Sequence, residues 1–241
     1  MSSHSGLARR TTLRHATNDA HARLDGAIAS AELLSSRERY EAYLQATWAA
    51  RRPFEVALEK SDVAELYPAW PRRRISDALM QDIVDVSHAP PAEAYAAPTD
   101  PLTIGQSLGI LYVLEGSALG ARMLKRRVAA IGMTADFGAR HMAAQTSEPR
   151  AWGEFLSLLE RTELDTAEEE LCAKAATGAF ARFEQAFQRL AVDGVASPEI
   201  VGTSFTAAAP VFGQQSLLIQ KNTRDDAAAG RRAIQMTVPT A

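Results

Sequence analysis

Apolar residues recur at helical spacing along roughly the first four-fifths of the chain, and strand-like alternation is nearly absent there. Residues 7–29 carry Leu13, Ala20, Leu24 and Ile28 along one side of a helix. The same periodicity predicts further helices over residues 35–53, 75–86, 101–131, 149–161 and 166–190. This succession of helices predicts an all-α helical bundle built as a single domain.

Capping residues, prolines and glycines mark where these helices are expected to begin and end. Residues 35–38 (SSRE) and 166–169 (TAEE) each have the form of a capping box. Pro53 is expected to bend or end the second helix, because proline lacks the N–H that the helix needs. Pro101, after Asp100, is expected to open the long helix, and Gly132 is expected to cap its end.

The segments without helical periodicity are predicted to be linkers, loops or tails. Residues 88–101 contain four prolines and are predicted to form a linker inside the domain, and residues 133–147 a polar loop. Residues 1–6 are expected to be a flexible N-terminus, which leaves a helical domain over residues 7–190. Residues 191–241 are expected to be disordered or loosely docked, with one strand-like stretch at 216–220.

Composition and charge exclude several classes of protein. Twenty-six basic residues against 29 acidic ones give a net charge of −3, which argues against a protein that coats nucleic acid. The single cysteine, Cys172, excludes an internal disulfide framework and a Cys-x-x-Cys metal motif. The N-terminus lacks the apolar region of a secretory signal, and no stretch is long and apolar enough to span a membrane. We therefore expect a cytoplasmic protein.

The first predicted helix carries a histidine that could hold a metal. At about 100° per residue, His21 lies about 80° from Leu13, on the shoulder of the apolar face, whereas His15 points to the opposite side. Arg14 lies seven residues before His21, on the same side and roughly 10 Å away along the axis. A lone helical histidine is more often a surface or core residue. The spacing nevertheless suits a ligand that has both a metal and an anionic edge.

The long central helix carries an unusual stripe of glycines. Gly105, Gly109, Gly116 and Gly120 fall within about 60° of one another, and Tyr112 lies on the same stripe. Each glycine inside a helix costs about 1 kcal/mol relative to alanine, so the cluster needs a reason. Close packing against another helix is one reason, above all for Gly105 and Gly109. For Gly116 and Gly120, the other reason is that bare backbone can bend and approach a flat ligand.

Two segments resemble motifs of one enzyme family. Residues 13–21 (LRHATNDAH) look like the proximal-histidine motif of haem oxygenases, and residues 112–120 (YVLEGSALG) resemble the distal-helix motif of their bacterial, biliverdin-producing branch. The two motifs lie about ninety residues apart, as they do in that family, and the resemblance covers about residues 7–190. It implies a bundle in which haem is sandwiched between a proximal helix and a kinked distal helix.

The resemblance also implies a role for individual residues. His21 would be the axial ligand of the haem iron, and Gly116 and Gly120 would form the kinked distal helix over the other face. Ser117 would join a polar, water-bearing distal pocket, although animal members of the family carry an aspartate there. Arg14 and Tyr112 match the positions that hold the haem propionates in bacterial members.

The activity that the resemblance implies is oxidative degradation of haem. Haem, as substrate and cofactor, would react with O2 and electrons to give biliverdin, CO and free ferrous iron. The electron donor would be a ferredoxin or a flavin reductase, and a bilin-binding photoreceptor is a further possible partner. Neither nucleic acid nor a membrane is expected as a partner.

Three other interpretations stay open from the sequence. The first is a haem carrier or sensor of the same fold without oxygenase activity. The second is an enzyme of similar helical architecture, such as the thiaminase-like proteins, although Cys172 between Leu171 and Ala173 is more easily explained as a buried structural thiol. The third is a structural adaptor, which leaves the glycine stripe beside an inward histidine unexplained.

Overall fold

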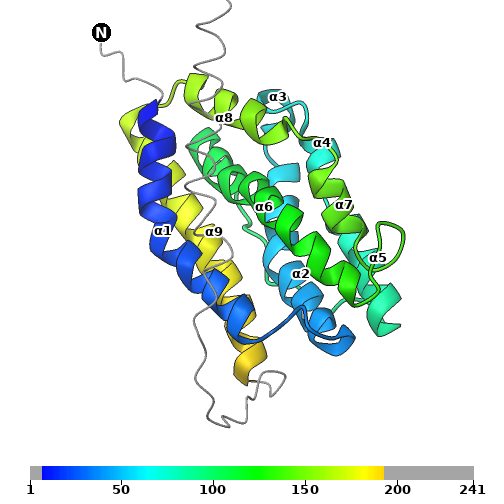
Figure 1. Cartoon of the computed structure of the whole chain (residues 1–241). Coiled ribbons are helices and arrows are strands. Elements are labelled where there is room, and N and C mark those ends of the chain that lie inside the picture. Colours follow the sequence, from blue (N-terminus) through cyan, green and yellow to red (C-terminus); the bar gives the residue numbers. More distant parts are fainter. Residues whose placement is uncertain (1–6, 193–241) are drawn as a thin grey trace, which may run out of the picture. The chain divides into compact units, whose positions relative to one another are not determined.

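The computed structural model of the chain describes residues 7–192, which form helices joined by loops (Figure 1). Among these residues there is no strand, only isolated bridges at Thr134. The helices of the described part are α1 (Leu7–Ser30), α2 (Arg37–Glu59), α3 (Val63–Leu66), α4 (Trp70–Arg73), α5 (Ser76–Ser87), α6 (Ile104–Ala130), α7 (Arg140–Thr146), α8 (Ala151–Arg161) and α9 (Thr166–Val192). The all-α prediction is therefore confirmed.

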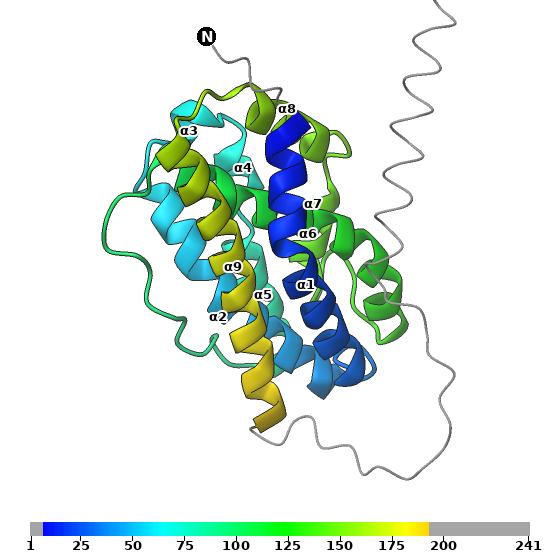
Figure 2. The ribbon, with the colours of Figure 1, turned by 90° about the vertical axis from the view of Figure 1, so that its left-hand side faces the viewer.

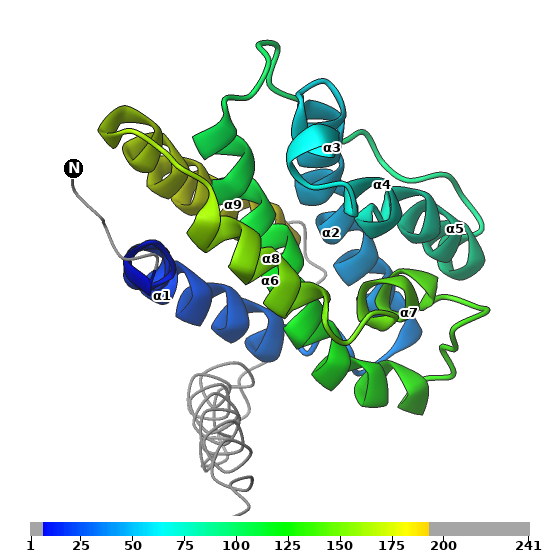
Figure 3. The ribbon, with the colours of Figure 1, turned by 90° about the horizontal axis from the view of Figure 1, so that it is seen from above.

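Helix α9 is the element against which the other long helices pack. It contacts α6, α1 and α2, and Figure 2 shows it running between α1 and α2. Helix α8 lies across one end of α1 and α6 and contacts both (Figures 1 and 3). Helices α1 and α6 are thus both supported by α8 and by α9.

Helix α2 continues through Pro53, so the prediction that Pro53 bends or ends this helix is wrong. Pro53 is buried, and α2 runs on to Glu59. A helical proline leaves the carbonyl four residues earlier without its usual donor. Here that carbonyl belongs to Ala49, and the backbone N–H of Tyr95 donates to it at 3.4 Å. The linker after α5 therefore supplies the missing hydrogen bond.

Helix α6 begins three residues later than Pro101 indicated. Thr103 is the N-cap: its hydroxyl accepts from the backbone N–H of Gln106, whose side chain accepts from the N–H of Thr103. This is a complete capping box, and it determines the start of the helix more strongly than the proline does. The other end agrees with the prediction, because Gly132 directly follows the last turn with a φ of +85°.

In both predicted capping boxes, the N-cap residue in the structure differs by one position from the predicted one. Helix α2 is capped by the Ser36 side chain, which accepts from the N–H of Arg39 at 3.2 Å. Helix α9 is capped by Asp165, whose carboxylate accepts from the N–H of Glu168 at 2.9 Å. Ser35 and Ser36 are the same residue type, so type alone cannot rank them, whereas aspartate is a better N-cap than threonine and Asp165 is favoured over Thr166.

The predicted polar loop at 133–147 contains a short helix, α7, so this prediction is also wrong. The N–H groups of Arg140 and His141 at its start both donate to the buried Asp82 carboxylate of α5, at 2.9 and 2.8 Å. This cap comes from 58 residues away in the sequence, so no local signal marks the start of α7.

The N-termini of two more helices are capped by carboxylates from helices distant in the sequence. Glu55 of α2 accepts from the N–H groups of Ile75 and Ser76 at the start of α5, at 3.0 and 3.1 Å. Glu168 of α9 accepts from the N–H of Gly105 at 2.6 Å, in the first turn of α6. Negative charge at a helix N-terminus satisfies exposed N–H groups and complements the helix dipole.

The remaining predictions concern parts of the chain at or beyond the described range. The helical region, predicted to end at 190, continues to Val192. The flexible N-terminus at 1–6 and the strand-like stretch at 216–220 lie outside the described residues, as does almost all of the tail at 191–241. Within residues 7–192, none of the helices is long and apolar enough to cross a membrane.

Candidate functional site

His21 lies on α1 with one ring nitrogen held by a carboxylate. Its Nδ1 is 3.3 Å from Oδ2 of Asp25, one turn further along the helix, and its ring lies 5.5 Å from that of Phe180 on α9. Burial raises the pKa of Asp25, although the contact with His21 acts in the opposite direction. A carboxylate on Nδ1 fixes the orientation of the ring, so a metal would bind through Nε2.

The charge of Arg14 on α1 reaches Tyr112 on α6, although the two residues lie far apart in the sequence. Burial raises the pKa of the Tyr112 phenol, and the positive charges of Arg10 and Arg14 lower it, as does the Thr17 hydroxyl. Both arginines lie on the same side of α1, one turn apart. Guanidinium groups bind carboxylates through charge-assisted hydrogen bonds, so Arg10 and Arg14 are candidates for binding an anionic ligand near Tyr112.

The glycine stripe divides into two kinds of position, as the sequence suggested. A Cβ at Gly105 would lie 2.2 Å from the carbonyl oxygen of Glu168, and one at Gly109 would lie 2.1 Å from that of Cys172. These two glycines therefore let α6 pack closely against α9. At Gly116 a Cβ would meet only the Trp152 ring, at an ordinary 3.6 Å, so packing of the described residues does not require glycine there.

The distal-motif glycines lie within one uninterrupted helix. Helix α6 continues from Ile104 to Ala130 through both Gly116 and Gly120, and Gly120 is buried. A kink at these positions stays a prediction. Trp152 of α8 lies over this part of α6, with its ring 5.7 Å from that of Tyr112 and 5.9 Å from that of Phe155. Its indole nitrogen is buried with no hydrogen-bond partner among the described residues.

Ser117 of α6 belongs to a polar network that joins α6 to α2 and α7. Its hydroxyl accepts from Nε2 of Gln145 at 2.8 Å and from Nη1 of Arg51 at 3.3 Å, and donates to the carbonyl of Leu114 at 2.6 Å. Two buried ion pairs adjoin it. Arg51 binds Glu55 at 2.6 Å, and the Arg73 guanidinium binds the Glu115 carboxylate through Nε and Nη2.

The charges in this network are held by hydrogen bonds as well as by pairing. Burial pushes the pKa of Glu55 upwards, but the Arg51 charge and the hydrogen bonds that Glu55 accepts outweigh it, so its pKa is lowered. Glu55 is therefore a carboxylate anion in the folded protein. The network includes two residues of the 112–120 motif, Glu115 and Ser117, which flank Gly116.

Cys172 lies away from this chemistry. It is buried on α9, and burial raises the pKa of its thiol to about 12, so it stays protonated and unreactive near neutral pH. The structure thus agrees with a buried structural thiol. A catalytic cysteine, which the thiaminase-like interpretation favours, is not supported here.

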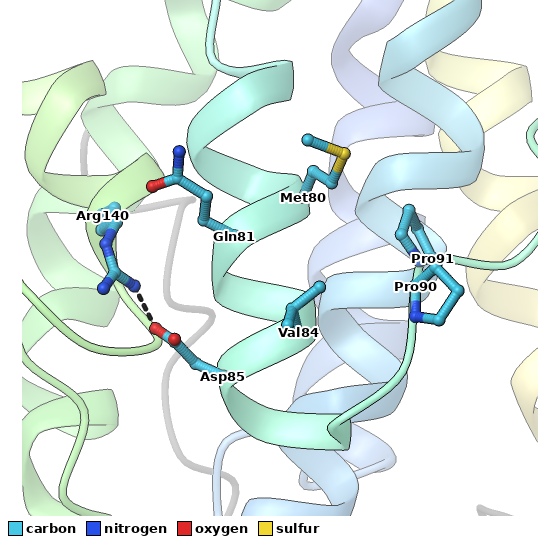
Figure 4. Close-up of a pocket in the computed structure, with 7 residues that line it drawn as sticks. All are labelled: Met80, Gln81, Val84, Asp85, Pro90, Pro91 and Arg140. Atoms are coloured by element: carbon cyan, nitrogen blue, oxygen red, sulfur yellow. Dashed lines mark hydrogen bonds and ion pairs between the residues drawn. The ribbon is translucent and has the colours of Figure 1, made fainter.

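A separate surface pocket of about 260 Å³ lies between α5, the linker after it and the start of α7 (Figure 4). Its lining residues are Met80, Gln81, Val84, Asp85, Pro90, Pro91 and Arg140, and Arg140 and Asp85 form an ion pair. None of the site residues predicted from the sequence belongs to this lining.

Sequence reasoning missed several residues that the structure places at the site. Arg10 did carry a signal, because it lies one turn before Arg14 on the same face of α1. Asp25 also carried one, four residues after His21. Arg51 and Gln145 carried none, because their contacts with Ser117 join segments that lie far apart in the sequence.

Comparisons with known proteins point to one family. The sequence model of the family described as Heme oxygenase matches residues 77–189. The chain is 33% identical over 174 residues to "Heme oxygenase PigA" of Pseudomonas aeruginosa, across 72% of this chain and 88% of that protein. Its fold is similar to a crystal structure of the NO- and CO-bound haem oxygenase of Neisseria meningitidis, with a TM-score of 0.69, 23% identity, and coverage of 83% of this chain and 100% of that one. The chain belongs to the haem oxygenase family.

Proposed function

We propose that His21, Arg14, Tyr112, Gly116 and Gly120 hold haem between α1 and α6. The chain is a haem oxygenase, an oxidoreductase for which haem is both substrate and prosthetic group and O2 the co-substrate. Biliverdin, CO and free ferrous iron are the products that we assign to it. The observation that supports the placement is that α8 and α9 each contact both α1 and α6, and that the charge of Arg14, on the same side of α1 as His21, lowers the pKa of Tyr112 on α6.

The residues present fit haem on both of its faces and at its edge. On α1, Asp25 holds Nδ1 of His21, so Nε2 would bind the iron. On α6, Gly116 presents backbone without a side chain. At the end covered by α8, Arg14 and Tyr112 would bind the propionates, and Arg10 adds a second cation for the second carboxylate.

Each group has a separate task in the reaction. Haem supplies the iron at which O2 is reduced and the porphyrin carbon that is oxidised. The imidazole of His21 would hold the haem iron, and the Gly116 segment of α6 would provide the space for O2. By binding the propionates, Arg14 and Tyr112 would fix the orientation of haem in the site, and this orientation would decide which meso carbon is oxidised.

Electrons must reach this site from a partner protein. We assign this role to a ferredoxin or a flavin reductase in the cytoplasm, and a bilin-binding photoreceptor is the partner that would receive the product. A haem carrier or sensor of the same fold would use the same residues for binding, so turnover is the property that distinguishes the two.

The test is a titration of the purified protein with hemin, followed by addition of ascorbate or a reductase system in air. We expect one-to-one binding, then loss of the Soret band and growth of a broad red absorption from biliverdin. The His21→Ala variant is the control and should lose the ligation spectrum of the parent. A stable haem complex that is not degraded would show a carrier or sensor, and the absence of saturable binding would refute the proposal.

A further inference from the structure

The Ser117 hydroxyl joins three helices. A hydroxyl has one hydrogen to donate and two lone pairs that accept. Ser117 uses all three: it donates to Leu114 and accepts from Gln145 of α7 and Arg51 of α2. The hydroxyl therefore ties α6 to its neighbours and has no further capacity to bond a ligand in this arrangement.

The bond between Ser117 and Gln145 closes a ring of buried contacts. The main-chain carbonyl of Gln145 accepts from Nη2 of Arg73 at 3.3 Å, and Arg73 binds the Glu115 carboxylate at 2.9 to 3.2 Å. Glu115 and Ser117 are the two neighbours of Gly116 in α6. The ring thus runs through α4, α7 and both residues that flank Gly116.

Gly116 needs an external restraint of this kind. Glycine lacks the side chain through which a helical residue is normally held against its neighbours, and its backbone is the most mobile of any residue. The only described atoms near the position of its missing Cβ belong to one ring edge of Trp152, at 3.6 and 3.7 Å. The position of the Gly116 backbone therefore depends on how firmly residues 115 and 117 are held.

We propose that Gln145 is a positioning residue for the haem site: through Ser117, it fixes the Gly116 backbone of α6 against the distal face of haem. The inference rests on the proposed function, which makes α6 the distal helix. Gln145 itself does not touch haem. Its side-chain amide and main-chain carbonyl are the two points at which α7 closes the ring, and the residue is buried.

The first test measures amide hydrogen exchange in the haem-free protein. Gln145→Met keeps the length of the side chain and removes the donor to Ser117. We expect amides 115–119 to exchange at least about fivefold faster, once the change in global stability is subtracted. Tyr40→Phe is the matched control, because it removes another buried hydrogen bond, from the Tyr40 hydroxyl to the carbonyl of Gly138 at 2.7 Å, outside the ring. Equal exchange in the Gln145 and Tyr40 variants would overturn the proposal.

The second test uses a spectroscopic probe of the distal face. The infrared C–O stretching band of the ferrous complex with carbon monoxide should shift or split in Gln145→Met and in Ser117→Ala. Ser117→Thr, which keeps the hydroxyl, should restore the band of the parent, and Tyr40→Phe should leave it unchanged. An unmoved band in both Gln145→Met and Ser117→Ala would refute the role of Gln145 towards haem.

The two proposals fail in different ways. If the parent protein binds no haem, the proposed function is wrong, and the role of Gln145 falls with it. If the parent binds and degrades haem but the Gln145 variant matches Tyr40→Phe in exchange and in its infrared band, only the positioning role is wrong. Because Ser117→Ala removes a single oxygen atom, it serves as the second variant should Gln145→Met fold poorly.

Discussion

Two glycines seven residues apart on α6 should respond in opposite ways to the same substitution. In Gly109→Ala the new Cβ would lie 2.1 Å from the carbonyl oxygen of Cys172, so α6 and α9 would have to separate by more than about 1 Å. Overpacking of this kind costs about 1–3 kcal/mol, and the better helix propensity of alanine returns about 1 kcal/mol. We expect a net loss of up to about 2 kcal/mol in the free energy of unfolding, and a Tm lower by up to about 8 °C.

In Gly116→Ala the new Cβ meets only the Trp152 ring, at 3.6 Å, so the gain in helix propensity is not opposed. The haem-free protein should become more stable by up to about 1 kcal/mol, with a Tm higher by about 2–4 °C. Haem binding should nevertheless weaken about tenfold, because the methyl group enters the face that the proposed function assigns to haem. A gain in stability together with a loss of affinity identifies a glycine that is kept for ligand binding.

Thermal unfolding followed by circular dichroism, together with a hemin titration, measures both effects. Gly178→Ala is the control for propensity alone, because the described structure places nothing within 4 Å of a Cβ at this exposed position of α9. The reasoning is refuted if Gly109→Ala matches Gly178→Ala in stability. It is also refuted if Gly116→Ala lowers the Tm as much as Gly109→Ala does.

Four further predictions concern His21, the two arginines Arg10 and Arg14, and Cys172. His21→Ala should abolish axial ligation in the visible spectrum, and added imidazole should restore it; an unchanged spectrum would show that another residue binds the iron. Arg10→Gln and Arg14→Gln should each weaken hemin binding about fivefold at low salt and less at high salt, whereas Arg126→Gln, an exposed control on α6, should have no effect. The Cys172 thiol, with its pKa raised to about 12, should react slowly with iodoacetamide at pH 8.5 unless denaturant is added. Because the folded protein holds this proton at pH values where the unfolded chain releases it, the thiol should lower stability as the pH rises from about 9 to 12, measurable by urea unfolding.

The parts of the fold that could be predicted are those with local signals. The long helices α1, α6 and α9 follow from apolar periodicity. Gly132 marks the end of α6 because its φ of +85° is a backbone conformation that glycine adopts without strain. Close packing against another helix is one explanation that the sequence offers for Gly105 and Gly109, and the structure shows that this helix is α9.

The parts that could not be predicted depend on contacts between distant segments. The continuation of α2 through Pro53 depends on an N–H of the linker, from Tyr95, that reaches the Ala49 carbonyl. The contacts of Ser117 depend on Gln145, which lies in a helix that the sequence indicates as a loop. Residue types on one helix can suggest a haem site, but the arrangement that holds them comes from other helices.

The long-range caps described above predict an order of helix formation during folding. A seven-residue helix such as α7 is far too short to persist by itself in water. It gains its first hydrogen bonds only when Asp82 arrives on a formed α5, and α5 in turn starts on Glu55 of α2. We therefore expect α2, α5 and α7 to form in that sequence during refolding. Asp82→Asn should slow the last of these steps, leaving helix formation in α1 and α9 at its original rate.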